Sequence, residues 1–324
     1  MLAAICRTLD GPDAVTLAEL PPPEAGPDEV VVRVKAAALN FLDTLITRGK
    51  YQYRPELPFS PAAEIAGIVE SAGANVTRLE PGDSVCGYIG WGGARELAAV
   101  KADALVKIPD GVSFEAAAGT PIVYGTGLHG LKDRAGLKAG ETLAVLGASG
   151  GAGLAAVELG KAMGARVIAV ASSPEKLAAC RAHGADETFN YATGDLKQGL
   201  RELTGGKGVD VVYDCVGGDF AEAAIRSIAW GGRFLVVGFA AGQIPRIPLN
   251  LMLLKSCSVI GVFWGEMAVR EPERQRRNLE EILASVAAGR LKPHIHRIHP
   301  LSQTGAAIKS LEARSVVGKV IVTI

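Results

Sequence analysis

The chain has 324 residues, of which 48% are hydrophobic and 21% are charged, and its formal net charge is +0. This length allows a large core and two domains, and the balanced charge provides no electrostatic surface for nucleic acid or an anionic membrane. No apolar run is long enough to span a membrane, and the five cysteines show no C-x-x-C spacing, so we expect a cytoplasmic protein without a disulfide framework or a structural zinc site.

The first 110 residues indicate a β-rich module with many loops. Residues 30–34 and 65–69 form short β-branched runs bounded by proline and glycine, which is the pattern of strands. Only residues 39–47 and 113–118 favour helices in this part of the chain.

From about residue 122, predicted strands and helices alternate. Continuous apolar runs, typical of strands covered on both faces, predict strands at 142–146, 166–171, 187–190, 209–215, 233–237 and 258–263. The first five are separated by predicted helices at 153–163, 175–182, 195–203 and 220–228. This order predicts a doubly wound parallel sheet. We expect the remainder, with a helix at 271–288, a strand at 294–298, another helix and a strand at 319–324, to complete the N-terminal module.

A glycine-rich turn, Gly147-Ala148-Ser149-Gly150-Gly151-Ala152-Gly153, follows the first of these strands. In a G-x-G-x-x-G pattern Gly150 and Gly153 fit, whereas Ala148 replaces the first glycine. The middle glycine lets the backbone approach a pyrophosphate, the last lets helix and strand pack closely, and the helix N-terminus favours negative charge. We therefore expect a dinucleotide to contact Ser149, Gly150, Gly151, Ala152 and Gly153.

The end of the second strand indicates which dinucleotide binds. An NAD site usually has Asp or Glu about 20 residues past the glycines, whereas this chain has Ser172-Ser173-Pro174-Glu175-Lys176. Hydroxyls and an ammonium would bind a 2′-phosphate that a carboxylate would repel, so Ser172, Ser173 and Lys176 favour NADPH. A serine followed by proline is also an ordinary helix start, and both interpretations can hold. Tyr191 is a further expected contact, either stacking on adenine or bonding the 2′-phosphate.

Several short motifs are spread along nearly the whole chain: Ala38-Leu39-Asn40-Phe41-Leu42-Asp43, Arg48-Gly49-Lys50-Tyr51, Pro61-Ala62-Ala63-Glu64-Ile65-Ala66-Gly67, Tyr124-Gly125-Thr126-Gly127, Asp214-Cys215-Val216-Gly217-Gly218 and Gly318-Lys319-Val320. With the glycine turn, they resemble the quinone oxidoreductase (zeta-crystallin-like) branch of the zinc-free medium-chain dehydrogenases/reductases. The resemblance implies a GroES-like β-rich catalytic domain (residues 1–121 and 264–324) split around a Rossmann NADPH-binding domain (residues 122–263). It also implies a homodimer joined through the Rossmann edge strands, here residues 258–263.

The residue types argue against a metal site. The zinc alcohol dehydrogenases have Cys where Asn40 stands and a metal-binding His where Ala63 stands, and Ala63 cannot bind a metal. Their lobe of four closely spaced cysteines has no counterpart in this sequence. Ala62 also replaces the glycine usual in the family's P-G-x-E motif, and we expect this change to shift the loop that shapes the substrate pocket.

By resemblance, Asn40, Asp43 and Tyr51 line the substrate pocket. Tyr51 either donates a hydrogen bond to the substrate oxygen or only shapes the site as an aromatic wall, and Asn40 could instead bond backbone near the nicotinamide. The further cofactor contacts that carry over by position are Thr126, Val216, Phe239, Phe263 and Trp264.

Without a metal, the cofactor must supply most of the chemistry. We therefore predict an NADPH-dependent reductase that transfers hydride to small quinones or α,β-unsaturated carbonyls, with one or two donors stabilising the oxyanion and a proton from water. One alternative is an enoyl-thioester (acyl-CoA) reductase, which would need a basic groove that the sequence does not locate. Another is a non-catalytic NADPH-binding protein, since some relatives serve as lens crystallins or bind RNA.

Overall fold

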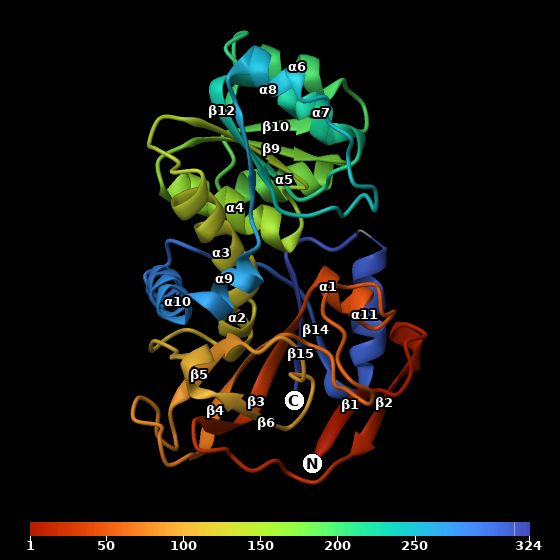
Figure 1. Ribbon diagram of the computed structural model, residues 1–324, viewed down its shortest axis with the longest axis vertical. Helices are drawn as coiled ribbons and strands as arrows, with labels where there is room; N and C mark the ends of the chain where they lie inside the picture. Colours follow the sequence, from red (N-terminus) through yellow and green to blue (C-terminus); the bar gives the residue numbers. More distant parts are fainter. Residues whose placement is uncertain (314) are drawn as a thin grey trace. The chain divides into compact units, whose positions relative to one another are not determined.

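The computed structural model describes residues 1–313 and 315–324, and its contacts divide the chain into two compact units (Figure 1). The β-rich unit consists of Met1–Ile122, Ala268–Gly289 and Pro293–Ile324, and the parallel-sheet unit consists of Val123–Met267 and Arg290–Lys292. The short Arg290–Lys292 segment is held in the parallel-sheet unit by a carboxylate, because the Lys292 N–H donates to Oε2 of the buried Glu158 at 2.9 Å.

Six parallel strands form the sheet of the parallel-sheet unit, in the order β10-β9-β8-β11-β12-β13. Their bounds are β8 Thr142–Leu146, β9 Arg166–Ala171, β10 Glu187–Asn190, β11 Val209–Asp214, β12 Ile228–Val236 and β13 Ser258–Gly261. The strand order reverses between β8 and β11, and the carboxyl ends at such a reversal form the usual ligand crevice of an open parallel sheet. The predicted doubly wound sheet is confirmed.

Helices cover both faces of this sheet: α4 and α5 lie on one side, and α6, α7 and α8 on the other (Figure 1). The helix bounds in and around this unit are α3 Pro121–Leu128, a π-helical turn at His129–Arg134, α4 Gly151–Ala162, α5 Pro174–Ala182, α6 Leu196–Leu203, α7 Asp219–Arg226, α8 Asn250–Lys255 and α9 Trp264–Arg270. The central strand β8 is buried on both faces from Leu143 to Leu146, as its continuous apolar sequence predicted.

Several predicted boundaries in this unit are wrong, and the strand expected at 233–237 begins five residues earlier, at Ile228. The helix expected at 220–228 ends at Arg226, because Ile228 instead pairs with Val209 of β11 and begins β12. The last strand ends at Gly261 instead of residue 263. For the helix, strand pairing outweighs the local helical preference. The last strand ends with its last pair, Gly261 with Val236 of β12.

A seven-stranded sheet forms the centre of the β-rich unit, in the order β14-β15-β3-β4-β5-β7 with β6 paired to β3. The strands are β3 Glu29–Leu39, β4 Glu64–Ala72, β5 Ser84–Tyr88, β6 Leu97–Lys101, β7 Leu105–Lys107, β14 Ile295–Pro300 and β15 Lys319–Thr323, and β1 Leu2–Cys6 pairs with β2 Val15–Glu19. C-terminal β15 lies antiparallel to β3. Chain segments from both ends of the sequence therefore build one sheet.

The helices of the β-rich unit are α1 Phe41–Ile46, α2 Phe114–Ala118, α10 Pro272–Ala287 and α11 Thr304–Glu312. Residues of α2 and α10 share one apolar cluster with the sheet, including Ala117, Leu279 and Leu283. A second and larger cluster contains residues of β3, β4 and β15 together with Ile308 of α11. Within the described residues, no helix is both long and apolar enough to cross a membrane.

Candidate functional site: a cofactor half and a catalytic half

The glycine turn between β8 and α4 has the close packing expected of a dinucleotide-binding turn. Gly147 adopts a φ of +70°, a conformation that favours glycine. A Cβ atom on Gly153 would lie 2.2 Å from the carbonyl oxygen of Gly147, so only glycine allows helix and strand to approach this closely. The sharp turn is made by Gly147, which explains how the completely buried Ala148 can stand in the first glycine position of the pattern.

The start of α4 presents backbone N–H groups. Gly150 is the N-cap, and Gly151, Ala152 and Gly153 form the first turn, whose N–H groups have no partner within a helix. Such a helix start attracts an anion. Ser149 is buried at this turn, and all five predicted glycine-turn contacts lie together.

The predicted phosphate residues also lie together, at the end of β9. Lys176 Nζ donates to Ser172 Oγ at 3.1 Å, and Ser173 caps α5 by accepting from the Lys176 N–H at 3.4 Å. Ser173 is thus a helix cap, as its sequence context predicted. The cap leaves the hydroxyl of Ser172 and the ammonium of Lys176 side by side at the carboxyl end of a parallel strand.

Sequence reasoning overlooked the carboxylate in the same turn. A hydrogen bond from the Ser173 side chain is the main cause that lowers the pKa of Glu175, and this carboxylate is fully exposed. A carboxylate at this position would repel a phosphate held by Ser172 and Lys176, and would compete with it for the Ser173 hydroxyl. This turn therefore carries one positive charge, on Lys176, and one negative charge, on Glu175. It is not the purely basic site that the two serines and the lysine suggested.

The remaining predicted cofactor residues have packing partners in the parallel-sheet unit. The ring of Tyr191 packs against Phe220 with centroids 4.5 Å apart. Three of these side chains pack closely against a glycine: Val216 against Gly147, Phe239 against Gly217 and Trp264 against Gly125. In each pair, a Cβ atom added to the glycine would lie within 2.9 Å of the neighbouring side chain. Thr126 is partly buried in α3, and Phe263 is exposed just after β13. Val216, Phe239 and Phe263 follow strand ends, whereas the buried Trp264 packs against α3.

The residues predicted to line the substrate pocket lie in the β-rich unit, where β3 leads into α1. Asn40 is the N-cap of α1, and its N–H donates to Asp43 Oδ2 at 2.8 Å. The other carboxyl oxygen of Asp43 accepts from the Ala62 N–H at 2.9 Å. Asp43 is only 1% exposed, so it holds the helix start and the neighbouring loop together from inside.

The environment of Asp43 favours its protonated form. Burial raises the pKa of Asp43 to about 6, although hydrogen bonds from the Asn40 and Ala62 N–H groups and the charge of Lys319 all favour the carboxylate. Burial is therefore the dominant cause.

Ala62 has a backbone conformation that favours glycine. Its φ is +69°, in the left-handed region, and its side chain is completely buried. Asp43 accepts a hydrogen bond from the Ala62 N–H, which holds the backbone of this loop in place. The expected shift of the loop stays a prediction. The alanine accepts a conformation that costs roughly 1–2 kcal/mol more than for glycine.

The side chain of Asn40 is engaged on both faces. Its Nδ2 donates to Glu64 Oε1 at 2.8 Å, and its Oδ1 accepts from Lys319 Nζ at 2.6 Å. Sequence reasoning placed neither Glu64 nor Lys319 in the site. Each is a lone charged residue at the start of an apolar strand, and a charge buried in this way requires a partner, which is the signal that could have found them.

Tyr51 lies beside a second tyrosine near Asp43. The Tyr51 and Tyr53 ring centroids are 5.8 Å apart, with the ring planes at 58°, and Tyr51 packs against an apolar cluster that includes Phe59. Burial, then Tyr53, then Asp43 raise the pKa of Tyr51. The phenol therefore keeps its proton at neutral pH and can donate a hydrogen bond, and both interpretations of Tyr51, as a donor and as an aromatic wall, stay predictions.

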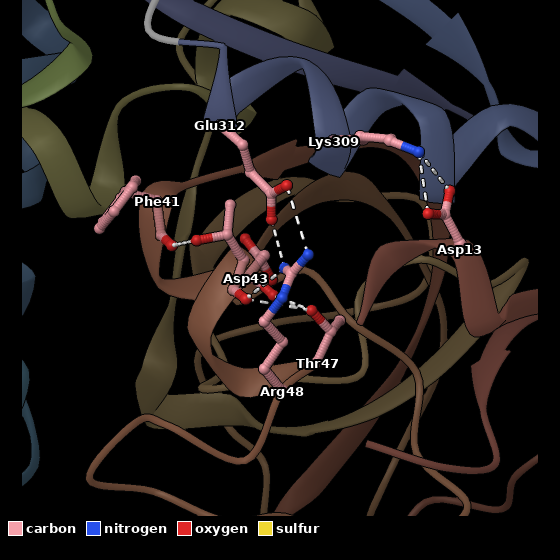
Figure 2. A network of polar contacts seen from close by, with 8 residues as sticks. Asp13, Phe41, Asp43, Thr47, Arg48, Lys309 and Glu312 are labelled. Carbon is pink, nitrogen blue, oxygen red and sulfur yellow. Dashed lines mark hydrogen bonds and ion pairs between the residues drawn. The ribbon is translucent and has the colours of Figure 1, made fainter. Parts of the chain in front are cut away.

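A polar network ties α1 to the C-terminal helix α11 (Figure 2). Arg48 forms an ion pair with Glu312 of α11 and donates to the Thr44 carbonyl at 3.1 Å. Thr47 donates to the Asp43 carbonyl at 2.8 Å. These bonds fix the end of the short helix that carries Asp43, and so fix the segment that leads to Tyr51.

The structure thus places the predicted site residues in two sets, one in each unit. Asn40, Asp43 and Tyr51 belong to the β-rich unit, and the cofactor residues belong to the parallel-sheet unit. Among residues 1–313 and 315–324, no group of three or more His, Cys, Asp or Glu side chains is placed to hold a metal ion.

Known proteins similar to this chain agree with this architecture. Two family profiles match it: "Alcohol dehydrogenase GroES-like domain" over residues 26–110 and "Zinc-binding dehydrogenase" over residues 151–284. The Nematostella vectensis protein "Quinone oxidoreductase-like protein 2 homolog" is 40% identical over 300 residues, which cover 92% of this chain and 82% of that protein.

Solved structures are similar over the whole length. The quinone oxidoreductase of Pseudomonas syringae pv. Tomato DC3000 is 34% identical with a TM-score of 0.93, and the match covers 100% of both chains. Escherichia coli quinone oxidoreductase complexed with NADPH is 28% identical with a TM-score of 0.91, again over 100% of both chains. The chain therefore belongs to the medium-chain dehydrogenase/reductase family, among its quinone oxidoreductase-like members.

Proposed function

We propose that this protein is an NADPH-dependent oxidoreductase that transfers a hydride to quinones or α,β-unsaturated carbonyls without a metal. The observation that carries the proposal is the pairing of Lys176 with Ser172, 3.1 Å apart. Ser172 directly follows β9, where an NAD site usually has a carboxylate. The carboxylate of this turn, Glu175, lies further along, in the first turn of α5. The E. coli relative was solved with NADPH, which supports the same cofactor.

The residues of the parallel-sheet unit fit a dinucleotide. The contact between Gly153 and Gly147 leaves no room for a side chain, and the N–H groups at the start of α4 supply the partial positive charge that a pyrophosphate needs. NADPH, when bound, supplies the hydride. We propose the following residues as its contacts: Thr126, Ser149, Gly150, Gly151, Ala152, Gly153, Ser172, Ser173, Lys176, Tyr191, Val216, Phe239, Phe263 and Trp264.

We assign the handling of the acceptor to Asn40, Asp43 and Tyr51. A quinone that takes up a hydride and one proton becomes a hydroquinone, and an enone becomes a saturated carbonyl compound, so the protein must stabilise a developing oxyanion. Tyr51 suits this role because its raised pKa keeps the phenolic proton available as a hydrogen-bond donor. The proton comes from water, and Asp43 acts by holding the helix start at Asn40.

Aromatic residues favour a flat ring as the acceptor. Six of the seven aromatic residues of the β-rich unit lie in residues 41–59 and 88–91. Tyr51 and Tyr53 are in ring contact, and both raise the pKa of Tyr88 after burial. Aromatic faces stack well on flat ligands, so a quinone suits this environment better than a short aliphatic enone.

We also propose that the protein forms a homodimer through β13. This strand is at one edge of its sheet, and an uncovered edge strand is a template for pairing with another chain. The preceding helix α8 and its N-cap Leu249 expose three leucines, since Leu249, Leu253 and Leu254 are 82%, 79% and 65% exposed. A second copy would cover both the edge and these leucines.

The direct test is NADPH oxidation, followed by absorbance, with 1,4-benzoquinone, naphthoquinones and an enone series, and with NADH in parallel. We expect turnover with NADPH that exceeds turnover with NADH, and quinones as the better acceptors. Tight NADPH binding with no turnover on any acceptor would overturn the enzymatic proposal and favour a binding role.

A further inference from the structure

A buried ion pair lies directly behind Asn40. Glu64, the first residue of β4, is 0% exposed, and Lys319, the first residue of β15, is 3% exposed. Their Nζ and Oε1 atoms are 2.6 Å apart. Burying two opposite charges contributes little net stability, because the cost of desolvating them offsets most of their attraction. The presence of this pair therefore needs another explanation.

The pair has all of its hydrogen-bonding groups satisfied. Lys319 Nζ has three acceptors: Glu64 Oε1, Asn40 Oδ1 at 2.6 Å and the Leu39 carbonyl at 3.1 Å. An ammonium has three hydrogens, so none is left over. Glu64 Oε1 accepts from Lys319 and from Asn40 Nδ2, and Glu64 Oε2 accepts from the Ile122 N–H at 2.8 Å.

Stability is a weak explanation for this arrangement, since apolar side chains of similar size often replace a buried ion pair without loss. Apolar replacements could not, however, fix the direction of the Asn40 amide. The oxygen and the NH2 group of a side-chain amide have nearly the same shape, and only their hydrogen-bond partners decide which of the two positions each occupies. Here the ammonium selects the oxygen and the carboxylate selects the nitrogen.

We propose that Glu64 and Lys319 are positioning residues that lock the Asn40 amide in one orientation, so that its second Nδ2 hydrogen is a fixed donor for a bound carbonyl oxygen. The inference rests on the proposed function in its assignment of Asn40 to the substrate pocket. The ammonium on Oδ1 also polarises the amide, and a polarised amide is a stronger donor. The charge pair thus serves the site through Asn40 and does not contact the substrate.

A double-mutant cycle tests this with NADPH and 1,4-benzoquinone. The neutral pair Glu64→Gln/Lys319→Met is combined with Asn40→Ala, and kcat and KM are measured for all four proteins. In the native background the pair change is expected to lower kcat by about tenfold to a hundredfold, as expected for a misplaced catalytic group. In the Asn40→Ala background it should lower kcat no further. Equal losses in both backgrounds would overturn the proposal, because the pair would then act on the fold and not through Asn40.

A native chain without turnover would count against the proposed function alone. A spectroscopic measurement still tests the orientation of Asn40 in that case. The chain has five asparagines, so selective ¹⁵N-asparagine labelling gives five side-chain amide signals, and Asn40→Ala identifies the one from Asn40. We expect slow hydrogen exchange for this signal, and faster exchange with a changed shift in the pair variant. An unchanged signal would overturn the orienting role.

The pair Glu64→Gln/Lys319→Gln serves if the methionine variant does not fold. It removes both charges but keeps polar side chains of similar length. The glutamine at 319 can still donate to Asn40 Oδ1, so this variant should retain more of the native kcat than the methionine variant where both fold. Where only the glutamine variant folds, any kcat loss it shows must vanish in the Asn40→Ala background, and persistence of that loss would contradict the proposal.

Discussion

Lys319 Nζ lies 2.6 Å from Glu64 Oε1, and these two side chains are among the most deeply buried charged groups of the chain. Their separation in sequence is large, at 255 positions. The contact therefore joins the C-terminal strand to the strand that follows the Ala62 loop.

Breaking this pair on one side should be costly. Lys319→Met leaves the Glu64 carboxylate buried without its cation, and we expect the free energy of unfolding to fall by about 3–5 kcal/mol. Urea denaturation measures this loss. The matched control, Glu64→Gln/Lys319→Met, removes both charges and should recover most of the stability. A single variant as stable as the native chain would show that the two groups do not interact as described.

Asp43 should make stability depend on pH. Its pKa rises from an ordinary 3.8 to about 6 on folding, mainly through burial. Between these values the unfolded chain releases a proton that the folded chain keeps, so this group lowers the free energy of unfolding as the pH rises, and the effect levels off above about 6. Of the charged groups around Asp43, Lys319 lowers this pKa and Glu64 raises it. Tyr51, Tyr88 and Cys6 also face Asp43, and their raised pKa values keep them neutral over this range.

Asp43→Asn isolates this contribution. The native chain minus the variant should show a difference in unfolding free energy that decreases by up to about 3 kcal/mol between pH 4 and pH 7. Urea denaturation across that range measures the difference. A difference that is constant or grows with pH would mean that Asp43 is not held protonated by burial.

Two glycines of the β8–α4 turn should respond differently to alanine. Gly153→Ala would place its Cβ 2.2 Å from the Gly147 carbonyl oxygen, so the helix must move and stability should fall by about 1–3 kcal/mol. The nearest atom to a Cβ on Gly150 is 3.5 Å away, so Gly150→Ala should fold with a smaller loss.

The same two variants test the approach of the cofactor. If the backbone at Gly150 approaches a pyrophosphate closely, Gly150→Ala should weaken NADPH binding in fluorescence titrations although its fold is intact. Unchanged NADPH affinity in Gly150→Ala would place the cofactor elsewhere.

The exposed leucines of α8 should control self-association. The side chain of Leu253 is 79% exposed in the single chain, and Leu253→Asp places a charge at this apolar position. We expect the dimer to dissociate at micromolar concentration in sedimentation velocity. Val269→Asp is the control, since Val269 is a similarly exposed apolar residue of the β-rich unit. A native chain that sediments as a monomer would contradict the dimer.

The fold followed from the sequence where the signal was local. The apolar run of β8, the glycines after it and the Ser-Pro start of α5 each predicted their element, because burial on both faces, a tight turn and a helix cap have characteristic residues. Boundaries set by strand pairing were not predictable in this way, and Ile228 is the example: its pairing with Val209 depends on a neighbouring strand.

The site was predictable in part for the same reason. Asn40, Asp43 and Tyr51 were found through motif resemblance. The sequence marks Glu64 and Lys319 as charges at the start of apolar strands, but their contacts with Asn40 depend on the β-sheet that brings β4 and β15 together with it. Glu175 is part of the same short sequence as Ser172 and Lys176, but its hydrogen bond with the Ser173 side chain is seen only in the structure. The bond from the Ala62 N–H to Asp43 was likewise not visible in the sequence, because it depends on the fold.

We propose that Ser172 and Lys176 hold the 2′-phosphate of NADPH. The most direct test is to measure the dissociation constants of NADPH and NADH for the native chain, for Lys176→Ala and for Glu175→Gln. Lys176→Ala should weaken NADPH binding by about 1–3 kcal/mol and leave NADH nearly unchanged. Glu175→Gln should strengthen NADPH binding, because it removes the carboxylate that shares Ser173. Equal losses of NADPH and NADH affinity in Lys176→Ala would contradict the account.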